Sequence, residues 1–280
     1  MRVTICGVRG STAATGVEFA GVGGNTSCVA LAHRGEAPRL LLDAGTGIRR
    51  VTTLLQGCPF RGTILLGHLH WDHTLGLPFF SAGDRPDAEV RLLMPEQDDE
   101  AEAVLRLLMS PPHFPIAPAE LRGDWKFASL PEGVHDIEGF NVEAREIPHK
   151  GGRTLGFRVT GRSGGSLAYL SDHAPIQLGP GPDGWGEYHR TAVELARGVD
   201  VLIHDAQYTA DELRGRAGWG HSAAEYAAGL AERAGARRAL LYHHDPSRTD
   251  EAVAEVAQAV RTRFPLVQVD VAVEGMEFEI

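Results

Sequence analysis

The chain has 280 residues, and 43% of them are hydrophobic, which is enough to bury a substantial core in one large domain or two small ones. Its formal charge of -10 at pH 7 opposes binding to a long polyanion, because nucleic-acid binding relies on Lys and Arg side chains that meet phosphates. The charge does not exclude a small anion held at a metal.

Short β-type runs open the first half of the chain, and each of them ends at Gly, Asp or Pro. A helix is predicted over residues 98–109, because acidic residues occupy its first turn and two prolines follow its end. The predicted strands of this half are residues 3–5, 27–32, 40–42, 64–66 and 90–93.

The second half repeats the mixture of strands and helices. Ser222 and Glu225 have the spacing of a capping box, which predicts a helix from there to about residue 234. Residues 250–264 place five apolar side chains on one helical face, and alternating valines predict a last strand from residue 267 to residue 273. The other predicted strands are residues 140–147, 155–160, 167–170 and 199–203.

Strands and helices are interspersed in both halves, and no linker or repeat separates the halves. We therefore predict an α/β protein in which two mixed sheets pack face to face with helices outside, as a single domain over residues 1–280. By pattern alone, an ordinary doubly wound sheet is the alternative. Residues 95–125 are predicted to form a lid or a dimer contact.

Cysteine usage and the N-terminal segment indicate the compartment. Cys6, Cys28 and Cys58 form no C-x-x-C pair, which argues against a disulfide framework and against a thiolate zinc site. The N-terminus has a short β-branched run instead of a signal peptide, and no stretch reaches transmembrane length. We expect a cytoplasmic protein without a membrane partner.

Four side chains that can bind metals follow the predicted strand near residue 65. His68 and His70 are two residues apart and project to the same side, while Asp72 and His73 can reach a second position nearby. Neutral imidazole and carboxylate groups suit zinc, and also manganese or iron, in sites that water completes. The sequence therefore predicts a metal centre here.

This H-x-H-x-D-H pattern is that of the metallo-β-lactamase superfamily, and the rest of the chain resembles its phosphodiesterase branch, which includes ribonuclease Z. The resemblance rests further on His149 before a Gly-Phe strand, on Asp172 after Tyr-Leu-Ser, and on His243 after Leu-Leu-Tyr. It implies the αββα four-layer sandwich of that family.

The resemblance also implies two divalent metal ions with a water between them. One site would use His68, His70 and His149, the other would use Asp72, His73 and His243, and Asp172 would be shared. His244 adjoins His243 and is the alternative last ligand.

Ribonuclease Z and its relatives carry a catalytic histidine at a helix start, and His221 occupies that place here. The resemblance assigns His221 to proton donation or phosphate binding, with Asp205 orienting its ring and Asp72 joining them in catalysis. Helix capping is the structural alternative for His221.

Three further residues are weaker candidates. Asp43 falls where the superfamily has a carboxylate that orients a ligand imidazole, although a plain turn aspartate fits equally. Arg9, in a Gly-rich loop, is a candidate anion contact, and His113, in the Pro-rich part of residues 95–125, is a candidate substrate contact.

We therefore expect a dinuclear metal-dependent hydrolase that cleaves a small anionic phosphodiester, such as a cyclic nucleotide or another cyclic phosphate, by a water activated between the metals. The alternatives are a nuclease of the ribonuclease Z type, a lactone or thioester hydrolase, and a nucleotide sensor without turnover. A ribonuclease Z usually recruits tRNA through a protruding basic arm, and no such insertion is seen. Family members often dimerise, so a homodimer is also expected.

Overall fold

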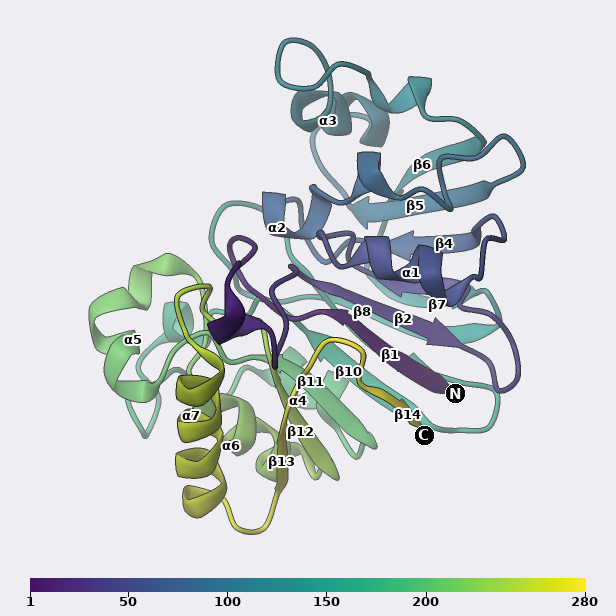
Figure 1. Cartoon of the computed structure of the whole chain (residues 1–280). Helices are drawn as coiled ribbons and strands as arrows, with labels where there is room; N and C mark the ends of the chain where they lie inside the picture. The colour runs from purple at the N-terminus through teal and green to yellow at the C-terminus, as the bar shows by residue number, and fades with distance from the viewer.

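The computed structural model describes residues 1–280 and contains two seven-stranded sheets (Figure 1). In spatial order, the first sheet comprises β14 (Glu277–Glu279), β1 (Arg2–Gly7), β2 (Cys28–Ala32), β3 (Leu40–Leu42), β4 (Arg61–Leu65), β5 (Glu89–Pro95) and β6 (Asp124–Leu130). The second sheet comprises β13 (Gln268–Val271), β12 (Arg238–Tyr242), β11 (Val201–Asp205), β10 (Ser166–Leu170), β9 (Leu155–Thr160), β8 (Phe140–Glu146) and β7 (Gly133–Ile137).

Helices cover the outer face of each sheet. None of the α-helices combines the length and the apolar character that crossing a membrane requires. The helices are α1 (Ile48–Leu54), α2 (Trp71–Thr74), α3 (Ala101–Leu108), α4 (Arg190–Ala196), α5 (Ala210–Arg216), α6 (Ala224–Ala234) and α7 (Asp250–Arg263).

Three hydrophobic cores separate the layers. The middle core holds 27 buried residues contributed by both sheets. A core of 28 buried residues lies between the second sheet and α4, α6 and α7, and one of 20 lies between the first sheet and α1 and α3. The predicted four-layer αββα sandwich is confirmed, and the doubly wound alternative is excluded.

The inner strands β2 and β3 are hydrophobic at every position because both of their faces are covered. In β3, Leu40 and Leu42 belong to the middle core, whereas Leu41 belongs to the outer core under α1. Side chains of a strand point alternately to its two faces, so one short run of leucines serves two cores.

Two local predictions were wrong. Ser222 and Glu225 do not form a capping box, because the Ser222 hydroxyl donates to the carbonyl of His173 and the Glu225 carboxylate accepts from the backbone of Ala210. The strand predicted over residues 267–273 is present as β13, but it is not the last one. After it, β14 pairs with β1 in the first sheet.

The topology brings several strand ends to one edge. β3 and β4 are parallel neighbours in the first sheet, and β10, β11 and β12 are parallel neighbours in the second. Loops that follow the carboxyl ends of parallel strands meet at the same edge of a sheet, where α/β proteins place their sites. Every residue of the predicted metal centre follows β4, β8, β10 or β12.

Candidate metal centre and active site

The structure brings all seven predicted metal ligands together at this edge. They form two groups, and the nitrogen and oxygen atoms within each group lie within 4.8 Å of one another. The first group is His68, His70 and His149, and the second is Asp72, His73, Asp172 and His243. That these residues bind metal stays a prediction.

Asp172 lies between the two groups, with one oxygen towards each. Its Oδ1 is 3.8 Å from Nε2 of both His68 and His149. Its Oδ2 is 2.9 Å from Nε2 of His73 and 3.3 Å from Nε2 of His243. A carboxylate whose two oxygens face different groups can bridge two cations, as the resemblance implies for Asp172.

The cluster contains buried polar atoms without a hydrogen-bond partner. Both ring nitrogens of His68 and both carboxylate oxygens of Asp172 are among them. Buried polar groups are normally paired, since an unpaired one costs free energy. Imidazole and carboxylate donors facing one another fit divalent cations, so the donor set suits the two predicted ions.

The electrostatics of the cluster favour neutral imidazoles in the first group. Burial lowers the pKa of His149 to about 4, and it also lowers the pKa of His68 well below the usual range. The pKa of His73 is raised, because Asp172, Asp72 and Asp43 outweigh the effect of its burial. The second group therefore concentrates negative charge that attracts a cation.

Asp43 holds the ring of His73 in place. Its Oδ2 accepts hydrogen bonds from Nδ1 of His73 and from the hydroxyl of Tyr169, each at 2.7 Å, and its Oδ1 accepts from the backbone of Gly67. The side chain of Asp43 is fully buried, and its backbone is left-handed, with φ of 62°. These contacts match the orienting role expected of Asp43 and leave the Nε2 atom of His73 directed at the cluster.

Asp43→Asn is expected to weaken metal binding by about 10- to 100-fold, because loss of a carboxylate that orients a ligand histidine has this effect in other metal sites. Asparagine tolerates the left-handed backbone, so the fold should persist. Competition with a chromogenic chelator measures the affinity. Asp200→Asn is the control, because Asp200 accepts a hydrogen bond from Ser166 far from the cluster. Equal affinities in both variants would contradict the role of Asp43.

His243, and not His244, faces the cluster. Nε2 of His243 lies 3.0 Å from Oδ2 of Asp72, whereas Nε2 of His244 bonds to the carbonyl of Ala272. Gly10 packs against the other side of the His243 ring, where an added Cβ would lie 2.3 Å from Nδ1. The Gly-rich loop near the N-terminus thus fits the ligand ring closely instead of cradling a phosphate.

His221 and Asp205 form a pair beside the cluster. Nδ1 of His221 donates to Oδ2 of Asp205 at 3.1 Å, so the carboxylate is in place to orient the ring. The His221 ring also stacks on that of His243, with centroids 5.1 Å apart. Burial opposes protonation, but Asp205, Asp172 and Asp72 outweigh it and raise the pKa of His221 to about 9.

His221 does not cap the helix that follows it. Helix α6 begins at Ala224, and its N-terminus receives no side-chain hydrogen bond. Asp205 is fixed in turn by the backbone NH groups of Gln207 and His173. The arrangement therefore favours the chemical role of His221 over the capping alternative.

Two weaker candidates are Arg9 and His113, and the contact of His113 with substrate stays a prediction. The prediction for Arg9 was wrong, because its side chain is fully buried and donates to the carbonyls of Gly23, Asp245 and Arg248. Arg9 thus ties the N-terminal loop to the C-terminal part of the chain and does not reach an anion. His113 is exposed and lines an apolar pocket next to the cleft.

An open cleft of about 630 Å³ lies over the cluster. It is lined by His70, Asp72, Asp172 and His221 together with Lys150, which is its only Lys or Arg. Sequence reasoning missed the apolar side chains of the cleft, and only the position of Trp71 between two predicted ligands could have indicated one of them. The other missed apolar residues are Leu69, Leu108 and Trp219, and the polar residues Ser11 and Lys150 were missed as well.

Comparisons with known proteins agree with this geometry. The model of the β-lactamase superfamily domain matches residues 38–244. The chain belongs to the metallo-β-lactamase superfamily. The match spans β3 to His244 and so includes the whole predicted metal centre. This match confirms the predicted superfamily. It also confirms the prediction that the protein is a metal-dependent hydrolase.

The relatives of this superfamily member point to its phosphodiesterase branch. A ribonuclease Z of Geobacillus kaustophilus is 27% identical, over 91% of this chain and 94% of that protein. The metallo-β-lactamase fold protein YhfI of Bacillus subtilis superposes with a TM-score of 0.70 at 17% identity, covering 100% of this chain and 99% of that one. A diphosphatase of the PhnP family has a TM-score of 0.66 at 18% identity, covering 100% and 97%.

Proposed function

We propose that the protein hydrolyses a small phosphodiester, most plausibly a cyclic nucleotide or another cyclic phosphate. The observation that carries this proposal is the His221–Asp205 pair, held beside the predicted ligands and lining the same open cleft. A proton donor next to a metal pair suits an ester whose leaving oxygen needs a proton. A thioester hydrolase has less need of such a donor, because a thiolate leaves readily without protonation.

The residues of the cluster and of the cleft would have different roles in this reaction. The two groups around Asp172 would hold two divalent ions, for which zinc is the first candidate and manganese and iron are alternatives. Two such ions, when bound, lower the pKa of a shared water and neutralise charge on a phosphoryl oxygen.

His221 would donate a proton to the leaving oxygen from Nε2, while Asp205 holds Nδ1 and fixes the direction of the ring. Lys150, which lines the cleft, would attract the anion as it enters. These roles require no movement of the buried side chains, because the pair is already hydrogen-bonded in the structure.

RNA 3′-end processing is the second candidate. It is favoured by the relative of G. kaustophilus, which is named ribonuclease Z and aligns with 91% of this chain. The formal charge of -10 and the single basic side chain of the cleft oppose it, since phosphate contacts by Lys and Arg dominate nucleic-acid affinity.

A panel of substrates separates these candidates. The metal-loaded protein is expected to cleave bis(p-nitrophenyl) phosphate or a cyclic nucleotide, with far weaker action on a β-lactam reporter and on a tRNA precursor. Rates are measured with each metal in turn and after chelation. If lactones or thioesters were cleaved efficiently while every diester was inert, the proposal would be wrong. Binding of a nucleotide without any turnover would make the protein a sensor.

A further inference from the structure

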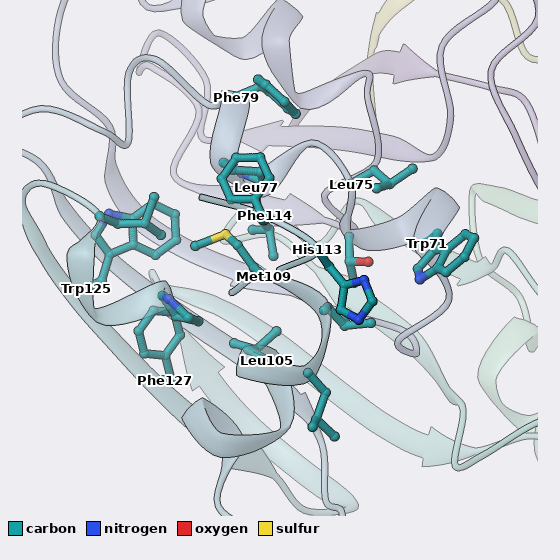
Figure 2. Close-up of a pocket in the computed structure, with 16 residues that line it drawn as sticks. Trp71, Leu75, Leu77, Phe79, Leu105, Met109, His113, Phe114, Trp125 and Phe127 are labelled. Atoms are coloured by element: carbon teal, nitrogen blue, oxygen red, sulfur yellow. The ribbon is translucent and has the colours of Figure 1, made fainter. Parts of the chain in front are cut away.

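An apolar pocket of about 400 Å³ adjoins the metal cleft. Of its 16 lining residues, 12 are hydrophobic. Figure 2 shows Trp125 and Phe127 at one end and Trp71 at the other, with Met109 and Phe114 between them. The volume falls in the range of small-molecule sites, which are concave and mostly apolar.

The pocket is built from segments that are distant in sequence. Its walls come from α2 and the residues after it, from α3, from the loop around His113, and from β6. Phe79 and Phe114 meet edge to face, with centroids 5.9 Å apart. Residues 95–125, predicted from sequence to be a lid or a dimer contact, supply one side of this pocket.

The pocket offers few free hydrogen-bonding groups, namely the indole NH of Trp71 and the imidazole of His113. The Thr74 hydroxyl donates to the carbonyl of His70, and the Trp125 indole NH donates to the carbonyls of Gly83 and Arg122. His113 is exposed. A nucleobase would leave its polar edge without partners here, which costs free energy, whereas a hydrocarbon loses nothing.

The pocket and the cleft share two wall residues. Trp71 and Leu108 line both of them. Trp71 lies between the predicted ligands His70 and Asp72, and 69% of its side-chain surface is exposed. A phosphoryl group at the cluster would therefore place a substituent of the same molecule beside the pocket.

We propose that this pocket binds an alkyl or aryl group esterified to the phosphate that the cluster cleaves. The inference rests on the proposed diester hydrolysis, and in place of a cyclic nucleotide it names a phosphodiester with one apolar ester group as the substrate. It also explains why apolar residues at the rim stay exposed, since large apolar patches on a protein surface mark sites of interaction. Leu75 and Phe79, at this rim, are 47% and 56% exposed.

The test uses p-nitrophenyl phosphodiesters whose second ester group is methyl, butyl, hexyl or octyl. In the wild-type protein, kcat/KM is expected to rise roughly 2- to 4-fold for each methylene until the pocket is full, in line with the transfer of a methylene out of water. Leu75→Gln should reduce this gain per methylene. The matched control is Leu178→Gln, because Leu178 is 50% exposed and lies outside the pocket.

The possible outcomes distinguish a failure of the pocket assignment from a failure of the proposed reaction. Equal kcat/KM along the series would overturn the pocket assignment and leave diester hydrolysis standing. If every diester is inert, calorimetry with octyl phosphate and methyl phosphate decides. Tighter binding of octyl phosphate, lost in Leu75→Gln, supports the pocket without the reaction, and equal binding overturns it. A dimer that Leu75→Gln dissociates, with no chain-length effect, would assign the pocket to a second copy of the chain and overturn the inference.

Discussion

Asp172→Ala is expected to reduce the metal content from about two ions per chain to one or none. In the two-metal model, each oxygen of Asp172 serves one centre. The structure places Oδ1 towards His68 and His149 and Oδ2 towards His73 and His243, so that the substitution removes a ligand from both centres at once. Elemental analysis of protein dialysed against a defined metal buffer measures the stoichiometry.

Asp270→Ala is the control for this substitution. Asp270 is half-buried and paired with Arg238 in the second sheet, so its loss removes a carboxylate without touching the cluster. It is expected to keep both ions. Saturation of the wild-type protein with a single ion would contradict the dinuclear assignment. An Asp172→Ala variant that keeps two ions would contradict the bridging role of Asp172.

His221→Ala is expected to keep its metals and to lose about 10²- to 10⁴-fold in rate, the usual effect of removing a general acid. The deficit should shrink for diesters with good leaving groups such as p-nitrophenolate, which need little protonation. Rates on substrates of graded leaving-group pKa, together with metal content and melting temperature, test this. His221 also lies within ligand distance of His149 and Asp172, and of Asp205 and His243. Metal retention is expected because the resemblance fills the ligand places with the seven other residues.

His33→Ala is a matched control, because His33 is 6% exposed, compared with 7% for His221, and lies outside the metal cluster. Its ring stacks on Phe140 and bonds to the carbonyl of Glu138, so its loss should lower stability but leave turnover intact. A His221→Ala protein that is metal-replete, less stable and fully active would give His221 a structural role only and remove it from the mechanism.

The sequence predicted those parts of the site that are local or follow a strand end. The His68-to-His73 cluster is defined by spacing within six residues, and His149, Asp172 and His243 were found through short motifs after strands. The choice between His243 and His244 needed the structure. The chain leaves β12 at Tyr242 and turns left-handed at His243, with φ of 58°, so strand alternation no longer tells which side chain faces the cluster.

Other features depend on contacts between distant segments, which local patterns do not encode. Arg9 lies in a loop typical of anion contacts, yet its partners come from residues more than 230 positions away as well as from Gly23. His33 belongs to no motif in the sequence, yet its ring is buried against Phe140 in the folded chain. The apolar pocket likewise forms only where α2, α3 and β6 come together, so no single segment of the sequence predicts it.

The predicted metal ligands come from both sheets, so the geometry of the cluster depends on how the two sheets are placed relative to each other. His68, His70, Asp72 and His73 follow β4 in the first sheet, whereas His149, Asp172 and His243 follow β8, β10 and β12 in the second. The middle hydrophobic core keeps these two sets of ligands at a fixed separation. The apolar layer therefore acts as a spacer between the residues that the two sheets contribute to each predicted metal site, and we expect its packing to affect which metal these sites select.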